Sequence, residues 1–170
     1  MPYRHKIWIA ALLVLAGVTH AQAEIQVGNK FPVLDASAYE GGTPPAITGL
    51  VTLVDFWASW CAPCKMSFPV YAKLHARFGS RGLVILAVSA DENQAAYNAF
   101  VKKEAPPFAT VRDKTHQLVR QVKVPAMPTC YLLGRDGRVR FVHKGFHGAE
   151  TEQELRQEIE SLLAEPPPQP

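Results

Sequence analysis

Two cysteines separated by two residues are the side chains best suited to chemistry in this chain; they lie in the run Trp60-Cys61-Ala62-Pro63-Cys64-Lys65. A bridge between Cys61 and Cys64 closes almost no loop, so it removes little entropy from the unfolded chain and is a poor structural staple. Thiols at this spacing can instead exchange with a partner's disulfide. We expect Cys61 to attack the partner and Cys64 to resolve the mixed disulfide, with no cofactor other than the redox-active disulfide Cys61–Cys64.

Two elements are expected to position this pair. Residues 50–57 form an apolar, β-rich run that predicts a buried strand, and residues 62–78 predict a helix. Cys61 then lies at or beside the helix N-cap, and Cys64 lies one turn inside. Unpaired N–H groups and the positive end of the helix dipole stabilise a thiolate at such a position. This arrangement predicts an exposed Cys61 sulfur with a lowered pKa.

The rest of the chain predicts one α/β domain over residues 24–164. Residues 24–50, rich in Gly and Pro, are expected to form an N-terminal extension with one or two short strands. After residue 78 the pattern predicts the following elements: a strand at 83–89, a helix capped by Asp91 or Asn93 and ending near 104, a strand at 108–111, a helix at 114–121 capped by Asp113, strands at 129–133 and 138–144 joined at Asp136-Gly137, and a helix at 151–164 with Thr151 and Glu154 as a capping box. This order implies a mixed central sheet, parallel at first with an antiparallel edge, flanked by helices on both faces.

Other uses of the cysteine pair fit the residues less well. A zinc site needs two further ligands, and only Cys130 and scattered histidines remain. Covalent haem attachment needs His directly after the second cysteine, where this chain has Lys65. A reactive dithiol is therefore favoured over a structural bridge, a metal site or a haem site.

The run from Val54 to Lys65 resembles the active-site signature of the thioredoxin superfamily. Further details resemble its exported TlpA/ResA-like branch: a long lead-in with Gly28 and Pro32, the Ser-Ala-Asp-Glu run at 89–92, and an additional helix before the third strand. The resemblance covers residues 26–163. It implies a thioredoxin fold and the activity of a protein-disulfide (thiol–disulfide) oxidoreductase.

The same resemblance implies a substrate-binding surface. Pro128 matches the cis-proline that faces the cysteine pair, the alternative being an ordinary trans loop proline. Met127 would present its backbone to a bound peptide, and Trp60, Ala62 and Pro63 would contact the substrate beside the cysteines. The second tryptophan of the motif, at position 57, is expected to pack in the core.

Two acidic positions also acquire roles from the resemblance. Asp55 matches the buried acid beneath Cys64 that accepts the resolving thiol's proton, and burial on a strand predicts a raised pKa for it. Many members of the branch carry Asn there, so Asp55 makes this chain more thioredoxin-like. Glu92 matches an acidic residue near the pair in ResA-like proteins; Asp91 competes for this role, and a solvated acid at a helix start is the alternative.

Three other candidate ligands receive structural interpretations. Cys130, on the predicted strand 129–133, is expected to fill the core as a small hydrophobe, with a third redox or metal-binding role as the alternative. His143 and His147 have no ligand spacing with the pair, so we expect both on the surface and no metal site.

Composition and the chain ends suggest an exported protein. The 170 residues are 48% hydrophobic and 19% charged, enough for a folded core. Residues 1–23 combine a basic start, an apolar stretch and Ala21-Gln22-Ala23, as in a cleaved signal peptide, with an uncleaved membrane anchor as the alternative. Without Arg4 and Lys6 the chain keeps 16 basic and 15 acidic residues, so nucleic acid is not an expected partner. The Pro-rich residues 165–170 are expected to be disordered.

The direction of electron flow is predicted from the residues around the thiols. Ala62 and Pro63 offer no side-chain hydrogen bond to a thiolate, and Met127 is apolar, which favours a reductant over an oxidase. The expected partners are disulfides of exported, periplasmic proteins, with apocytochrome c or a copper-site cysteine pair suggested by the resemblance, and a membrane thiol donor. The alternatives are a disulfide oxidase or isomerase, a copper metallochaperone, and a non-enzymatic binding module; the oligomeric state stays open.

Overall fold

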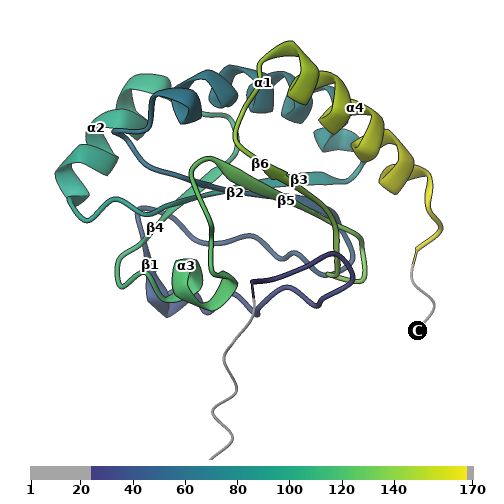
Figure 1. Cartoon of the computed structure of the whole chain (residues 1–170), viewed down its shortest axis with the longest axis horizontal. Coiled ribbons are helices and arrows are strands. Elements are labelled where there is room, and N and C mark those ends of the chain that lie inside the picture. The colour runs from purple at the N-terminus through teal and green to yellow at the C-terminus, as the bar shows by residue number, and fades with distance from the viewer. Residues whose placement is uncertain (1–23, 168–170) are drawn as a thin grey trace, which may run out of the picture.

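A six-stranded mixed sheet forms the centre of the computed structural model, which describes residues 24–167 (Figure 1). The strands lie in the order β1-β4-β3-β2-β5-β6. Strands β2, β3 and β4 are parallel, while β1, β5 and β6 run antiparallel to their neighbours. The bounds are β1 Tyr39–Glu40, β2 Val51–Trp57, β3 Leu83–Ser89, β4 Ala109–Asp113, β5 Thr129–Leu133 and β6 Val139–Lys144, with helices α1 Ala62–Phe78, α2 Gln94–Glu104, α3 Gln117–Val122 and α4 Ala149–Ala164. The predicted mixed sheet is confirmed.

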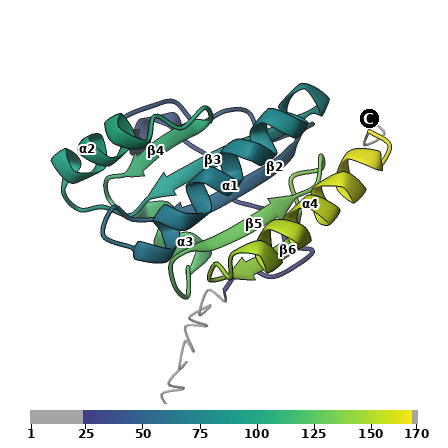
Figure 2. The ribbon, with the colours of Figure 1, turned by 90° about the horizontal axis from the view of Figure 1, so that it is seen from above.

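Helices cover both faces of this sheet. Helices α1, α2 and α4 lie over one face, and α3 lies over the other with the N-terminal segment (Figures 1 and 2). Along β2, Leu53 and Trp57 pack under α1, whereas Val54 and Phe56 pack into the opposite cluster. Because strand side chains alternate between faces, Asp55 shares the α1 face with Leu53 and Trp57.

The predicted helix over 62–78 matches α1, which begins directly after Cys61 and carries Pro69 in its interior. Two other predicted helix starts are wrong. The helix expected at 114 begins at Gln117, because His116 takes a left-handed conformation (φ 53°) that delays it. Asp113 still caps the helix, since its carboxylate accepts the N–H groups of Gln117 and Val119 at 2.9 and 3.0 Å.

The second wrong start concerns α4. The predicted capping box places Thr151 at the N-cap, but α4 begins earlier, at Ala149, after Gly148 at φ 67°. The hydroxyl of Thr151, already inside the helix, accepts the backbone N–H of His147 at 3.0 Å. A glycine with positive φ therefore starts the helix, and Thr151 ties the preceding residue to its first turn.

The N-terminal extension is part of the fold. Strand β1, one of the expected short strands, pairs with β4, and the backbone N–H groups of Gly28 and Phe31 bond to Val139 and Gly137 at 2.8 and 2.9 Å. The predicted signal peptide at residues 1–23 and residues 168–170 of the predicted disordered tail lie outside the described residues. Between residues 24 and 167, no helix has the length and apolar character needed to cross a membrane.

Candidate active site

The cysteine pair lies at the junction between the end of β2 and the start of α1. Cys61 is the N-cap of α1, with φ −81° and ψ 107°, and its Sγ accepts the backbone N–H of Cys64 at 3.3 Å. The two residues form a disulfide, with their Cα atoms 5.3 Å apart. The structure therefore brings the two predicted redox residues together and puts the Cys61 sulfur at the positive end of a 17-residue helix.

Access to the pair is narrower than expected. In the disulfide form Cys61 is 5% exposed and Cys64 is fully buried, so the expectation of an openly exposed Cys61 sulfur is wrong for this state. The neighbouring Trp60, by contrast, is 71% exposed. Met127 packs against the cluster that contains both cysteines. In this state, little of Cys61 is open to a partner.

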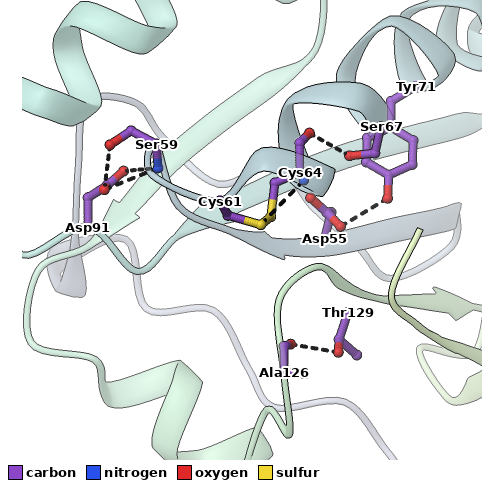
Figure 3. The surroundings of a disulfide bond; sticks show 9 residues. All are labelled: Asp55, Ser59, Cys61, Cys64, Ser67, Tyr71, Asp91, Ala126 and Thr129. Carbon is purple, nitrogen blue, oxygen red and sulfur yellow. Dashed lines mark hydrogen bonds between the residues drawn. A yellow bond between two sulfur atoms is a disulfide. The ribbon is translucent and has the colours of Figure 1, made fainter. Parts of the chain in front are cut away.

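The loop before β5 lies near the cysteine pair. Strand β5 begins at Thr129, which pairs with Phe56 near the C-terminal end of β2. The residues just before Thr129 therefore lie at the same end of the strands as the cysteines. The Met127–Pro128 peptide bond is cis, as predicted. The Thr129 hydroxyl donates to the Ala126 carbonyl at 2.8 Å and closes the loop below the disulfide (Figure 3).

Asp55 is fully buried under α1. Its Oδ1 accepts the hydroxyl of Tyr71 at 2.9 Å, and its Oδ2 has no hydrogen-bond partner in the part of the chain that the structure describes. Figure 3 shows the carboxyl group directed towards Cys64. Burial raises the pKa of Asp55 to about 7, as predicted in direction, and the hydrogen bond from Tyr71 limits the rise.

The two acids after β3 differ in their surroundings. Asp91 is buried and accepts hydrogen bonds from the Ser59 backbone N–H at 3.0 Å and the Ser59 hydroxyl at 2.8 Å (Figure 3). It also accepts one from the Ser89 hydroxyl at 2.8 Å. Glu92 is exposed, and its backbone carbonyl accepts a bond from Arg112. Of the two, Asp91 anchors the loop that leads into Cys61.

A shallow hollow of about 390 Å³ lies beside the pair. Trp60 and Ser59 form one wall, and Glu92 and Asn93, at the start of α2, form the other. Glu92 thus faces solvent at the rim of this hollow. Trp57 is fully buried and packs on Phe68 and Phe100 at 4.9 and 4.5 Å between ring centroids, so its predicted core role is confirmed.

The third cysteine and the two candidate histidines lie in different surroundings. Cys130 is a free, buried thiol opposite Asp55 in the β2–β5 pairing, consistent with the core interpretation. The prediction that His143 is a surface residue is wrong: its side chain is 13% exposed, and its Nε2 lies 2.6 Å from Glu158 of α4. His147 is exposed. Within residues 24–167, no group of three or more His, Cys, Asp or Glu side chains is arranged to hold a metal ion.

Four residues around the pair escaped the sequence analysis: Ser59, Ser67, Ser89 and Tyr71. Tyr71 lies seven residues after Cys64, and that spacing returns a side chain to the same helix face after two turns. The spacing was a usable signal, but nothing in the sequence showed which side chain of β2 it would meet. Ser59 gave no signal, because its partner Asp91 lies 32 residues further along the chain.

Comparisons with known proteins agree with this geometry. A family model described as the AhpC/TSA family matches residues 27–142. The chain belongs to this family. A ResA thiol-disulfide oxidoreductase of Bacillus cereus is 28% identical, over 82% of this chain and 80% of the relative. A protein described as a DsbE-type thiol:disulfide interchange protein of Chlorobium tepidum is 30% identical, with a TM-score of 0.75 over 83% of this chain and all of that structure.

A second solved structure adds to the agreement: StoA of Bacillus subtilis is 27% identical, with a TM-score of 0.57 over 64% of this chain and 84% of its own. The AhpC/TSA match, the ResA relatives and these structures identify a thioredoxin-fold protein of the TlpA/ResA-like branch. Its activity is that of a thiol–disulfide oxidoreductase.

Proposed function

We propose that this protein is an exported reductant of protein disulfides that uses Cys61 as nucleophile and Cys64 as resolving thiol. The observation that carries the proposal is the position of the Cys61 sulfur. It is the N-cap of α1, accepts a backbone N–H from within the helix, and is bonded to Cys64. A thiolate at this position gains from the helix dipole and from that N–H group.

In the first half of the reaction, the Cys61 thiolate of the reduced protein attacks one sulfur of a substrate disulfide. The substrate S–S bond breaks, a bond forms between Cys61 and the substrate, and the other substrate sulfur leaves as a thiolate that takes up a proton. The enzyme is then joined to the substrate by a mixed disulfide, and one of the two substrate sulfurs is already a free thiol.

In the second half, the Cys64 thiol gives its proton to Asp55 and attacks the Cys61 sulfur. The Cys61–Cys64 bond forms, and the second substrate sulfur leaves and is protonated. Substrate disulfide and enzyme dithiol have become substrate dithiol and enzyme disulfide, a two-electron exchange. Cys64 is buried and remote from solvent bases, and burial raises the pKa of Asp55 to about 7, so a neutral-pH proton acceptor is available under the helix.

The surface around the cysteine pair suits an extended peptide. Trp60 offers an exposed ring, Ala62 and Pro63 form the first turn of α1, and the Met127–Pro128 loop faces them from β5. We propose that a substrate segment lies between these two sides, with its disulfide over Cys61. Glu92, at the rim of the neighbouring hollow, would then meet substrate side chains and not the reacting sulfurs.

Direction and compartment are part of the proposal. The apolar Ala62, Pro63 and Met127 give the thiolate no side-chain donor, which favours the reducing direction. Residues 1–23 have the pattern of a signal peptide, which supports release into the periplasm. The substrates would be disulfides of exported proteins, such as an apocytochrome c or a copper-site cysteine pair. A membrane dithiol donor would return the enzyme to the reduced form.

The test combines an assay with a trap. The mature protein should reduce insulin disulfides, Cys61→Ser should be inactive, and Cys130→Ala, a matched loss of the remaining thiol, should keep most of the activity. Cys64→Ser expressed in cells should accumulate mixed disulfides through Cys61. Equal activity of Cys61→Ser and wild type would refute the mechanism, and a reduction potential above about −180 mV would refute the reductant assignment in favour of an oxidase or isomerase.

The proposed export is tested separately. Mass spectrometry of the exported protein should show Glu24 as its first residue.

A further inference from the structure

Side chains of helix α1 form hydrogen bonds both to the backbone of Cys64 and to the buried carboxyl group of Asp55. Cys64, Ser67 and Tyr71 lie three and four residues apart, so they share one face of the helix. The Ser67 hydroxyl donates to the Cys64 carbonyl at 2.8 Å, and the Tyr71 hydroxyl donates to Asp55 Oδ1 at 2.9 Å (Figure 3). The helix that holds the resolving cysteine therefore also holds the carboxyl group beneath it.

The bond to Tyr71 decides which carboxyl oxygen is free. The terminal torsion of an Asp side chain is soft, so a carboxyl group without partners can rotate between broad wells. Here Oδ1 is bound to the phenol, while Oδ2 is buried without a hydrogen-bond partner among the described residues. In Figure 3 this second oxygen lies on the side of the group that faces Cys64.

We propose that Tyr71 is a positioning residue for the second half of the exchange: its hydroxyl holds Oδ1 of Asp55 and thereby keeps Oδ2 free and aimed at the Cys64 thiol. This inference rests on the proposed function, in which Asp55 accepts the Cys64 proton. Tyr71 touches no reacting atom itself and acts only through the carboxyl group.

The other groups around Asp55 do not supply this donor. Cys130 on β5 lies directly opposite it in the strand pairing, and burial raises the pKa of this thiol well above its ordinary value, but among the described residues the thiol makes no hydrogen bond to the carboxylate. Ala87, the β3 neighbour, is apolar. Beyond Cys130, His143 of β6 pairs with Glu158 of α4. In the described part of the chain, the phenol of Tyr71 is the side-chain donor that reaches the Asp55 carboxylate.

The role predicts a measurable change in Tyr71→Phe. A phenol that donates to a carboxylate stabilises the ionised form, so its loss should move the Asp55 titration midpoint upwards by roughly one pH unit. The titration is measured by ¹³C NMR of the Asp55 carboxyl carbon in the oxidised protein, where neither Cys61 nor Cys64 titrates. The resolving step, followed as release of a stalled Cys61 mixed disulfide against pH, should shift by the same amount.

Tyr97→Phe is the matched control. Tyr97 is also buried, and its hydroxyl hydrogen-bonds to Thr110 at 3.2 Å, away from Asp55. It should leave both the Asp55 midpoint and the resolving step unchanged. An unshifted Asp55 midpoint in Tyr71→Phe overturns the inference. A shifted midpoint with an unshifted resolving step instead refutes the role of Asp55 in the proposed function.

A measurement on the wild-type protein guards against a variant that fails to fold. The ¹³Cζ resonance of Tyr71 should change with pH at the same midpoint as the Asp55 carboxyl carbon, because the two groups share a hydrogen bond. In Asp55→Asn this pH dependence should vanish. A Tyr71 resonance that ignores the Asp55 titration in the wild type overturns the inference without any Tyr71 variant.

Discussion

Replacing Asp55 with Asn should make the protein more stable at neutral and alkaline pH. The carboxyl group is fully buried under α1, and burial raises its pKa to about 7 from an ordinary 3.8. A folded protein with such a group binds a proton that the unfolded chain has already released between these two pH values. The free energy of unfolding must therefore fall as the pH rises through this window.

The size of the effect follows from the shift. A difference of about three pH units, at 1.36 kcal/mol per unit, corresponds to on the order of 4 kcal/mol. The penalty is absent below about pH 4, where the group is protonated in both states, and is complete above about pH 7. Asn keeps the shape and can still accept the Tyr71 hydroxyl, but it carries no charge, so the Asp55→Asn variant escapes the penalty.

The assay is urea unfolding of the oxidised wild type and of Asp55→Asn between pH 4 and pH 8.5. The difference between the two unfolding free energies cancels every other titrating group, and it should grow in favour of the variant as the pH rises. Asp35→Asn is the control. This exposed carboxylate has a lowered pKa because the Ser37 backbone N–H donates a hydrogen bond to it, so it is ionised in both states above pH 5. The unfolding free energy of Asp35→Asn, plotted against pH, should therefore run parallel to that of the wild type above pH 5. Parallel curves for Asp55→Asn would refute the reasoning, because the buried carboxyl would then cost nothing to ionise.

Three further substitutions test other parts of the structure. Asp91→Ala removes the acceptor of the Ser59 N–H and hydroxyl and should cost roughly 1–3 kcal/mol in chemical denaturation, with slower reaction of the cysteine pair with a model disulfide. His143→Gln should destabilise the protein at pH 6 and much less at pH 9, as measured by urea unfolding. Burial lowers the pKa of His143, but Glu158 and a second glutamate of α4 outweigh burial and raise it. The stabilisation by protonated His143 is therefore present below pH 6.5 and is lost as the pH rises through the folded-state pKa. Thr151→Val removes the acceptor of one backbone N–H at the start of α4 and should lower the unfolding free energy by about 1 kcal/mol, measured by thermal denaturation.

The cysteine motif and its two flanking elements could be predicted because their signals are local. A buried apolar run, a cysteine at its end and a helical pattern after it depend on neighbouring residues alone, and β2 and α1 lie almost where expected. The cis bond before Pro128 was predictable only through the family resemblance, since the residues around it do not distinguish it from an ordinary trans loop proline.

The errors have two sources: a local backbone conformation and contacts between distant residues. Thr151 and Glu154 have the spacing of a capping box, but Gly148 with positive φ starts α4 earlier and changes what both side chains meet. His143 looked like a surface residue because its partners lie on α4, outside its own strand. Local patterns predict which elements form; the partner of a polar side chain depends on how those elements pack.

The two cysteines have unequal surroundings, and this inequality explains why a buried acid would be kept at a cost to stability. Cys61 caps a helix and gains from its N–H groups, whereas Cys64 is fully buried, one turn inside, and lacks that benefit. If Asp55 serves as its proton acceptor, Asp55→Asn should raise the unfolding free energy at pH 8 and slow the resolving step in the same protein. A purely structural carboxyl group would change only the first quantity, so opposite effects on stability and on resolution would be the signature of a charge retained for the reaction.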